Sequence, residues 1–373
     1  MYAETIEHRY ERLGGFTSGF DYARLFLSIA VLTLHGYVLC QPEVRDFIWH
    51  SWFRPLPAII LPAFFALSGF LVTGSLQRQD ALIPFVTLRA IRLMPALAVE
   101  VLLSAFLLGP MVTSMALGQY FTDSLFFRYL LNIAGHISFY LPGVFLGPEN
   151  FSKPGIVNLS LWTIPFELKC YISLVGLSIL GVTRRRILFL GVTVVLVVAG
   201  TWRHFGEHSI DGDAVGGSAL VVAFLIGSCL ALFKDIALLR LDFFVISTIA
   251  AFVLLQIYSL EFVAMIPCAY MIVYLGMQNS ERYWIVSSGD YSYGIYLFAF
   301  PIQQTYFYLF PNNPYFVPSL IFSLIAAFAY AYFSWHFIER PILSRKKNIV
   351  KLVQGFADAL QRRIKGRLRK SMN

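Results

Sequence analysis

The chain has 373 residues, of which 58% are apolar and only 13% are charged. Soluble domains carry about 25% charged residues, so this composition excludes a water-soluble globular enzyme, a disordered regulator and a coiled coil. Phenylalanine and tyrosine are abundant, with 35 and 20 copies, as expected where aromatic side chains face lipid or the membrane interface. The composition therefore predicts an all-α fold, a polytopic bundle of membrane-spanning helices.

Ten runs of apolar residues are long enough, or nearly long enough, to cross a hydrocarbon core of about 30 Å as helices. In chain order these runs cover approximately 22–40, 56–76, 93–110, 160–180, 186–201, 214–233, 241–258, 262–278, 289–310 and 316–338. Charged side chains lie within the first twenty residues, ahead of the first run, so a cleavable signal peptide is not expected. We expect 1–341 to form one transmembrane unit and 342–373 to form a basic cytoplasmic tail.

Lysine and arginine are distributed unevenly between the segments that connect these runs. Ten spans place both termini on the same side, and that side carries 21 of the 29 Lys and Arg, against five on the other side. Such an excess marks the cytoplasmic side of a membrane, so we expect both termini to be cytoplasmic. The last 33 residues hold ten of these cations. A nucleic-acid arm is the alternative for this tail, but its position after an apolar span favours membrane lipids, and no nucleic-acid partner is expected.

The long segment 111–159 connects the third and fourth runs and contains FFRYLLNIAGHISFYLPGVF, which is too apolar for a free loop. Irregular backbone at membrane depth is tolerated only where protein or a water-filled cavity surrounds it. We therefore expect an interfacial or re-entrant piece here that covers an outward-facing cavity.

Ionisable residues inside the runs are the first candidates for function, because each costs about 2.5–3.5 kcal/mol at the centre of a membrane helix. Arg24 and His35 are eleven residues apart in the first run. On a helix this spacing places them within about 20° of the same face and about 16 Å apart along the axis. The alternatives are an arginine that reaches lipid headgroups and a histidine that makes a packing hydrogen bond between helices.

Glu167 in the fourth run is predicted to lie at about the same depth as His35, because the two helices run in opposite directions. A carboxylate beside an imidazole can orient it as a general base. The sequence therefore predicts a catalytic pair of Glu167 and His35, with a purely structural buried pair as the alternative.

Arg89 and Arg92 are spaced so that both guanidinium groups project from one face at the cytoplasmic entrance to the third run. Arginine matches phosphate with two hydrogen bonds, so this pair is a candidate dock for an anionic cytosolic cofactor, with anionic lipid headgroups as the alternative. Glu100 lies two turns deeper, and its role is open. The sequence contains no P-loop, HExxH or GxSxG motif and no dinucleotide glycine fingerprint, and no metal site is predicted.

Six segments occur in a characteristic order: FDYARLFLSIAVLTLHGY, FFALSGFLVTGSL, LRAIRLMPAL, NLSLWTIPFELKCYI, DYSYGIYLFAFPIQQ and FIERP. Together they resemble the signature segments of the membrane acyltransferase-3 family, integral bacterial acyltransferases that modify surface and exported carbohydrates. The resemblance extends from residue 20 to about residue 341. It implies a multi-pass protein of the bacterial inner (cytoplasmic) membrane.

The resemblance also implies roles for individual residues. The arginine and histidine of the family's first helix correspond to Arg24 and His35, its paired arginines to Arg89 and Arg92, and its acidic residue after the SLW element to Glu167. Expected substrate contacts are Ser68, Asn158, Trp162 and Tyr293.

The implied reaction moves an acyl group, acetyl first and succinyl second, from cytosolic acyl-CoA to a hydroxyl of a surface or exported carbohydrate. Acyl-CoA is then a co-substrate with no cofactor permanently bound, and the acceptor is a carbohydrate or a lipid-linked saccharide. His35 acts either as general base or as transient acyl carrier. A membrane transporter or flippase for such a substrate is the competing interpretation, because buried charges also line transport paths.

Overall fold

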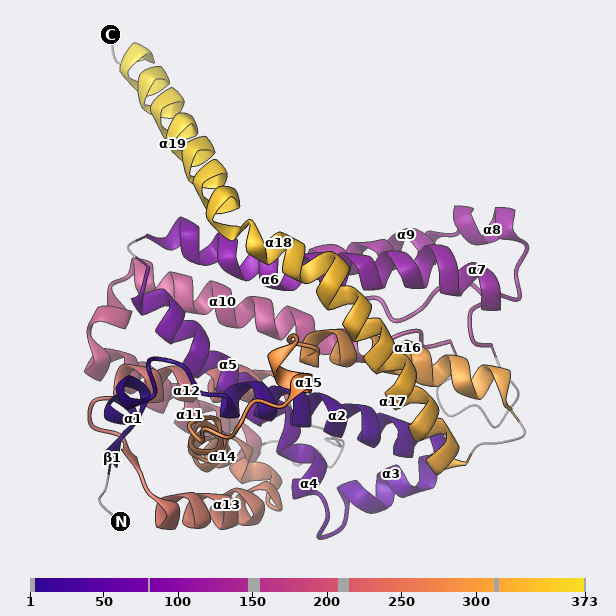
Figure 1. The fold of residues 1–373 in the computed structure, drawn as a ribbon, viewed down its shortest axis with the longest axis horizontal. Coiled ribbons are helices and arrows are strands. Elements are labelled where there is room, and N and C mark those ends of the chain that lie inside the picture. The colour runs from indigo at the N-terminus through magenta and orange to yellow at the C-terminus, as the bar shows by residue number, and fades with distance from the viewer. Residues whose placement is uncertain (1–3, 80, 147–154, 207–214, 312–314, 372–373) are drawn as a thin grey trace.

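The computed structural model describes residues 4–79, 81–146, 155–206, 215–311 and 315–371. Within these ranges the protein is almost entirely helical (Figure 1). Its strands are β1 (Glu4–Thr5) and β2 (Leu238–Leu239), which pair antiparallel and tie the N-terminal segment to the loop before α13. The all-α class predicted from the composition is confirmed.

Each of the ten predicted runs overlaps a helix, and the third helix begins at Leu82, well before the start predicted at residue 93. These helices are α2 (Gly19–Cys40), α5 (Ile60–Gln77), α6 (Leu82–Leu103), α10 (Ile164–Ile179), α11 (Arg186–Gly206), α12 (Gly217–Leu232), α13 (Leu241–Leu255), α14 (Glu261–Gly276), α16 (Ser292–Leu309) and α17 (Phe316–Phe333). Among the described residues, six helical stretches are long and apolar enough to cross a membrane: Gly19–Cys40, Pro55–Gln77, Leu82–Val112, Arg186–Phe205, Tyr258–Gly276 and Phe316–Ser344. The protein is thus a multi-pass membrane protein by the length and composition of its helices, while the full count of ten spans and their orientation remain predictions.

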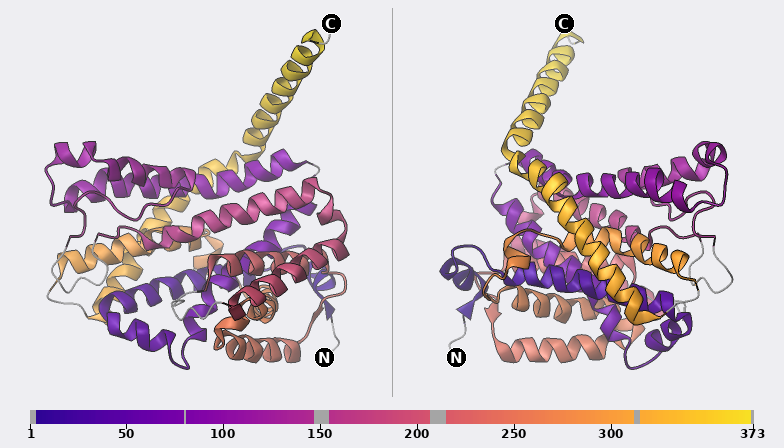
Figure 2. Two further views of the ribbon diagram at one scale, coloured as in Figure 1. Left: turned by 180° about the vertical axis from the view of Figure 1, so that it is seen from behind. Right: turned by 45° about the vertical axis from the view of Figure 1, so that its right-hand side comes forward.

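Shorter elements connect and extend these helices. They are α1 (Ile6–Arg12), α3 (Pro42–Trp49), α4 (Pro55–Ala58), the π-helical η1 (Ser104–Leu108), α7 (Gly109–Val112), α8 (Leu117–Thr122), α9 (Ser124–Leu130), η2 (Leu131–Ala134), η3 (Leu159–Thr163), η4 (Val182–Arg184), η5 (Tyr258–Leu260), α15 (Trp284–Ser287), the π-helical η6 (Ser334–Glu339), α18 (Arg340–Ser344) and α19 (Lys346–Ser371). The basic C-terminal segment forms α19, which projects away from the bundle (Figures 1 and 2).

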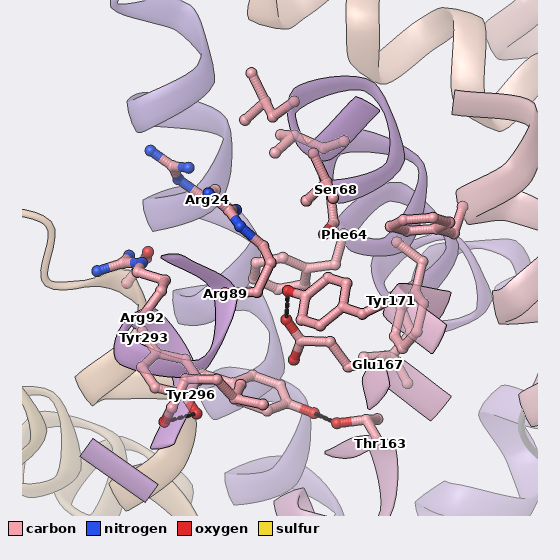
Figure 3. Close-up of a pocket in the computed structure, with 18 residues that line it drawn as sticks. Arg24, Phe64, Ser68, Arg89, Arg92, Thr163, Glu167, Tyr171, Tyr293 and Tyr296 are labelled. Atoms are coloured by element: carbon pink, nitrogen blue, oxygen red, sulfur yellow. Dashed lines mark hydrogen bonds between the residues drawn. The ribbon is translucent and has the colours of Figure 1, made fainter. Parts of the chain in front are cut away.

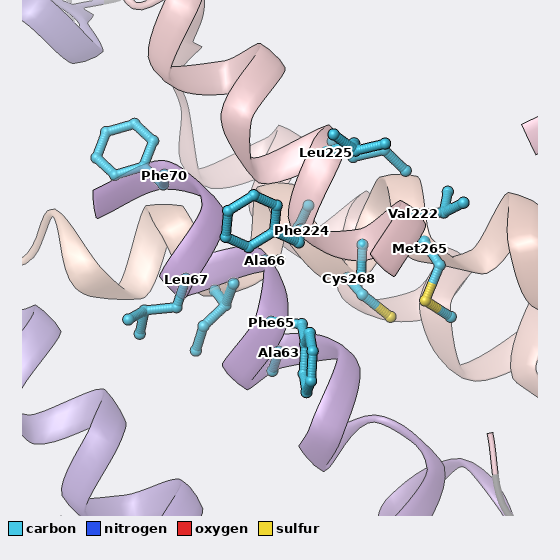
Figure 4. Close-up of a cluster of buried hydrophobic side chains, with 14 of the residues drawn as sticks. Ala63, Phe65, Ala66, Leu67, Phe70, Val222, Phe224, Leu225, Met265 and Cys268 are labelled. Carbon is cyan, nitrogen blue, oxygen red and sulfur yellow. The ribbon is translucent and has the colours of Figure 1, made fainter. Parts of the chain in front are cut away.

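Helices α5, α12 and α14 pack together in the main apolar core (Figure 4). The α5–α12 crossing depends on two glycines that face each other's helix. A Cβ atom on Gly69 would overlap the backbone oxygen of Phe224, and a Cβ atom on Gly227 would overlap the backbone oxygen of Ala66. Small residues let helix backbones approach closely where lipid supplies no hydrophobic driving force, so these positions hold α5 in a fixed place.

Helix α16 packs against α2 and α17. The side chain of Gln303 donates a 2.7 Å hydrogen bond to the backbone oxygen of Leu32 and passes over Gly36, where a Cβ atom would meet its amide nitrogen at 2.9 Å. This contact fixes the second half of α2, which carries His35, against α16.

Part of the apolar segment 111–159 is packed on the bundle, as its composition predicted. Tyr120 and Tyr129 are fully buried, and the Tyr120 hydroxyl donates a 2.7 Å hydrogen bond to the backbone oxygen of Ala105 in η1. Residues 147–154 lie outside the described ranges. None of the described residues of this segment lines the arginine pocket, and its role as a cover for an outward-facing cavity stays a prediction.

Candidate functional site

A pocket of about 160 Å³ opens among α2, α5, α6, α10, α12 and α16 (Figure 3). Its polar lining consists of Arg24, Ser68, Arg89, Arg92, Thr163, Glu167, Tyr171, Ser292, Tyr293 and Tyr296. Its apolar lining consists of Leu61, Phe64, Phe65, Leu67, Leu71, Val72, Leu93 and Phe224. A pocket with apolar walls and a few convergent charged groups is typical of a small-molecule site.

The three arginines singled out in the sequence come together here. Arg24 projects from the first half of α2, and Arg89 and Arg92 project from one face of α6. Their guanidinium groups lie on one side of the pocket, next to Glu167 and Tyr171 from α10 (Figure 3). The predicted substrate residues Ser68 and Tyr293 also line this pocket.

Two of the arginines are held by carboxylates. Arg92 pairs with Asp290 through one amino group and with Glu339 through the other, at 3.0 Å. Arg24 contacts the same Asp290 oxygen at 3.5 Å and pairs with Asp21 at 2.5 Å. Paired charges inside a protein hold one another in a defined geometry, so this network fixes both guanidinium groups at the pocket.

Sequence reasoning missed Asp290 and Glu339. Both lie at helix ends, Asp290 just before α16 and Glu339 at the end of η6, and charged residues are ordinary at the ends of apolar runs. A signal was present, because each acid belongs to one of the six segments that carry the family resemblance.

Arg89 differs from the other two arginines. Among the described residues no carboxylate lies within ion-pair distance of it, and its Nε atom, like that of Arg24, is buried without a hydrogen-bond partner. Its guanidinium group therefore has unused donors in the pocket, which is the condition for binding an anion from outside the chain.

The remaining polar side chains of the pocket are joined by hydrogen bonds. The hydroxyl of Tyr171 donates to Glu167, one helical turn away in α10. The hydroxyls of Thr163 and Tyr296 are 2.6 Å apart, and Tyr293 donates a 3.0 Å hydrogen bond to the backbone oxygen of Leu93.

His35 does not line this pocket, and the structure does not pair it with Glu167. Its ring meets the edge of Phe300 with centroids 5.3 Å apart, and its Nδ1 atom is buried without a hydrogen-bond partner. The expected pairing assumed that the fourth span begins near residue 160. The structure has η3 over residues 159–163 and α10 from Ile164, so Glu167 lies in the first turn of α10. There it lines the same pocket as the three arginines.

Asn158 and Trp162 also lie outside the pocket lining. Asn158 is fully buried and caps η3, accepting a 3.0 Å hydrogen bond from the backbone nitrogen of Ser160. Trp162 packs edge-on against Phe166, with ring centroids 5.8 Å apart. The donor and acceptor groups of the Asn158 side chain are used within the protein, which leaves the expected substrate contact without support.

No group of three or more His, Cys, Asp or Glu side chains that could hold a metal occurs among the described residues. The candidate site is therefore an arginine-lined pocket inside a membrane helix bundle, with His35 further along the face of α2 that carries Arg24. Charged groups inside a membrane bundle mark the candidate substrate site of a helical membrane protein.

The comparison with known proteins identifies the family. Residues 17–335 match the model of the acyltransferase domain family, and the chain belongs to this acyltransferase-3 family. The protein is therefore an acyltransferase enzyme, and the transporter or flippase interpretation is set aside. An O-acetyl transferase of Shigella phage Sf6 is 27% identical over 337 residues, which cover 87% of this chain and 96% of the relative.

A second relative, nodulation protein 10 of Rhizobium leguminosarum bv. viciae, is 29% identical over 205 residues. The match covers 52% of this chain and 53% of that protein. No solved structure matches the chain.

Proposed function

We propose that the protein transfers an acyl group from cytosolic acyl-CoA to a hydroxyl of a surface or exported carbohydrate in the bacterial inner membrane. The observation that carries the proposal is the position of Arg89, which faces the pocket without a carboxylate partner beside two arginines held by acids. A guanidinium with unused donors in a polar, protein-lined pocket is suited to a phosphate group.

In this proposal the pocket holds part of the acyl-CoA donor. Arg89 binds phosphate oxygens, and Arg24 and Arg92 add positive potential in a geometry fixed by Asp21, Asp290 and Glu339. The apolar walls from α5 accept the uncharged part of the pantetheine arm. With both termini cytoplasmic, as the distribution of Lys and Arg predicts, the arginines lie toward the cytosol, where acyl-CoA is available.

His35 then acts at the far end of the donor. It lies on the same α2 helix as Arg24, about 16 Å further along the axis, a distance that an extended pantetheine arm spans. As a general base, His35 takes the proton of a carbohydrate hydroxyl while the hydroxyl oxygen attacks the thioester carbonyl carbon. The carbon–sulfur bond breaks, and the thiolate of CoA leaves and takes up the proton.

As an acyl carrier, an imidazole nitrogen of His35 attacks the carbonyl carbon first and CoA leaves as the thiol. The hydroxyl oxygen then attacks the acyl carbon, the carbon–nitrogen bond breaks, and the imidazole of His35 takes up the hydroxyl proton. Both routes place His35 beyond the arginine pocket. Glu167 has a different role from the one expected, because its partner is Tyr171: it shapes the donor pocket.

Acetyl is the first choice for the acyl group, because the phage relative that aligns over most of both chains is named an O-acetyl transferase. Succinyl remains the second choice. The test is transfer of label from radiolabelled acetyl-CoA, and in parallel succinyl-CoA, by the purified protein in lipid nanodiscs. The acceptor is polysaccharide or lipid-linked saccharide prepared from cells that lack the gene.

Alkali-labile label on the carbohydrate, lost in the His35→Ala variant, is the expected result. Label that stays on CoA with every acceptor fraction, or transfer that survives in the variant, contradicts the proposal.

A further inference from the structure

Glu100 is a fully buried carboxylate in α6 that does not line the arginine pocket. Its Oε1 atom accepts hydrogen bonds from Asn158 Nδ2 at 2.8 Å, from Ser104 Oγ at 2.9 Å and from the Tyr129 hydroxyl at 3.5 Å. Its Oε2 atom is buried without a partner. A carboxylate inside a membrane bundle is retained where it has a function, and the reaction scheme above uses neither oxygen.

Asn158 links Glu100 to the chain segment that enters the pocket. Its Nδ2 atom donates both to Glu100 and, at 2.8 Å, to the backbone oxygen of Leu297 in α16. Its Oδ1 atom accepts the 3.0 Å hydrogen bond from the backbone nitrogen of Ser160 that caps η3. The amide is therefore oriented by two acceptors, one on α6 and one on α16, and in turn orients the start of η3.

The segment η3 connects Asn158 to residues that line the pocket. The backbone oxygen of Ser160 accepts a 3.2 Å hydrogen bond from the Tyr296 hydroxyl, which also bonds Thr163. Thr163 and Tyr296 line the pocket. Helix α10 follows η3 without a break, so the direction of η3 sets the place of Glu167 in the first turn of α10.

We propose that Glu100 is a positioning residue of this enzyme: it anchors Asn158 and so fixes η3, Thr163 and Glu167 at the wall of the donor pocket. Its contribution to turnover rests on the proposed function of that pocket, whereas its contribution to the geometry of η3 does not. Supporting groups that hold a reacting constellation in place act through turnover, because small displacements are costly there.

The alternative is that Glu100 itself exchanges a proton during the reaction. Glu100→Gln separates the two roles. The amide has the same shape and keeps an oxygen that accepts from Asn158 and Ser104, but it is a poor base. Glu100→Ala removes both the hydrogen-bond acceptor and the proton-exchanging group. If Glu100→Ala does not fold, Asn158→Ala breaks the same link from the other side.

The first measurement is hydrogen exchange of the full-length protein in lipid nanodiscs, followed by mass spectrometry of peptides that cover residues 158–167. It requires no substrate. Exchange in this segment should be roughly tenfold faster in Glu100→Ala and Asn158→Ala, the factor that corresponds to one lost hydrogen bond. Glu100→Gln should match the unaltered protein. Ser104→Ala is the matched control, because it removes a donor to the same oxygen and leaves the link to Asn158 in place.

The second measurement is steady-state transfer from acetyl-CoA per folded protein. Glu100→Ala should lower kcat roughly tenfold or more with a KM for acetyl-CoA within about threefold, and Glu100→Gln should restore kcat. Glu261→Ala removes another fully buried carboxylate, one that accepts from the backbone of Gly216, and should lower thermal stability without changing kcat per folded protein.

Unchanged exchange in both Glu100→Ala and Asn158→Ala would overturn the proposal, as would Glu100→Gln with the kcat of Glu100→Ala. If the unaltered protein transfers no acyl group from acetyl-CoA, the proposed function fails, and the exchange experiment alone still decides the role of Glu100 in positioning η3.

Discussion

Glu167 and Tyr171 face the arginine pocket from successive turns of α10, and the tyrosine hydroxyl donates a hydrogen bond to the carboxylate. The carboxylate is thereby held beside Arg89 and Arg92, at the donor end of the proposed reaction path. Arg24, which lines the same pocket, precedes His35 by about three turns of α2.

The Glu167–Tyr171 contact has a measurable consequence. Tyr171→Phe removes the hydrogen bond and leaves the ring, while Glu167→Gln keeps an acceptor for Tyr171 and removes the charge. Hydrogen bonds to charged groups contribute about 1.5–3 kcal/mol, so we expect Tyr171→Phe to lower kcat/KM for acetyl-CoA by roughly tenfold or more. Glu167→Gln should lower kcat more than it changes acetyl-CoA binding. Steady-state kinetics and equilibrium dialysis of labelled acetyl-CoA measure both, and an unaltered rate in both variants would remove Glu167 from the pocket's function.

Arg89 and Arg92 should respond differently to substitution because their partners differ. Arg89→Ala removes a guanidinium with no carboxylate partner, so the fold should persist while the Kd for acetyl-CoA rises by about tenfold or more. Arg92→Ala leaves Glu339 without its arginine and Asp290 with only the 3.5 Å contact to Arg24. Because Arg92 and Asp290 are partly exposed, the loss of stability should stay below the about 3–5 kcal/mol of a fully buried pair. The melting temperature and acetyl-CoA binding of both variants test this contrast.

Acetyl-dephospho-CoA, which lacks the 3′-phosphate, shows which phosphate Arg89 contacts. If the Arg89→Ala effect persists with this analogue, the pyrophosphate is the contact. Equal melting temperatures in the two arginine variants would contradict the different roles assigned to them.

The sequence predicted which helices carry the site residues better than it predicted how deep in the membrane those residues lie. Helix periodicity correctly placed Arg89 and Arg92 on one face of α6, because that spacing depends only on local geometry. The depth of Glu167 depends on where α10 begins, which is set by the capping of η3 by Asn158 and by contacts to Glu100 and Leu297. These contacts come from α6 and α16, which are far from η3 in the sequence, so no local sequence pattern predicts them.

The acids of the arginine network show the same limit. Asp290 and Glu339 lie at the ends of apolar runs, where charged residues are ordinary, and only the folded bundle brings them to Arg92. A single sequence could therefore predict that Arg24 and Arg92 need partners inside a membrane, but it could not say which acids supply them.

His35 should be required for transfer but not for donor binding. His35→Ala is expected to abolish acyl transfer while the protein still accumulates in the membrane, because the side chain makes an edge contact with Phe300 and its Nδ1 atom has no hydrogen-bond partner to lose. Because His35 does not line the arginine pocket, the Kd for acetyl-CoA should stay within about threefold of the unaltered protein, less than about 0.7 kcal/mol. Retained transfer in this variant would refute both routes proposed for His35.

The crossing of α5 and α12 should tolerate no side chain at its glycines. Gly69→Ala places a methyl group against the backbone oxygen of Phe224, and Gly227→Ala places one against the backbone oxygen of Ala66. Because backbone atoms cannot rotate away, we expect each variant to lose at least about 1–3 kcal/mol of stability and to displace Ser68 from the pocket wall.

Gly191→Ala in α11 is the matched control for these two variants, since no atom lies within 4 Å of a Cβ atom there. It should be neutral or stabilising by up to about 1 kcal/mol, because alanine favours the helix over glycine. Melting temperatures in detergent and the yield of monodisperse protein measure the difference. If Gly69→Ala and Gly227→Ala were as stable as Gly191→Ala, the close approach of α5 and α12 would not be what holds α5, and with it Ser68, at the pocket.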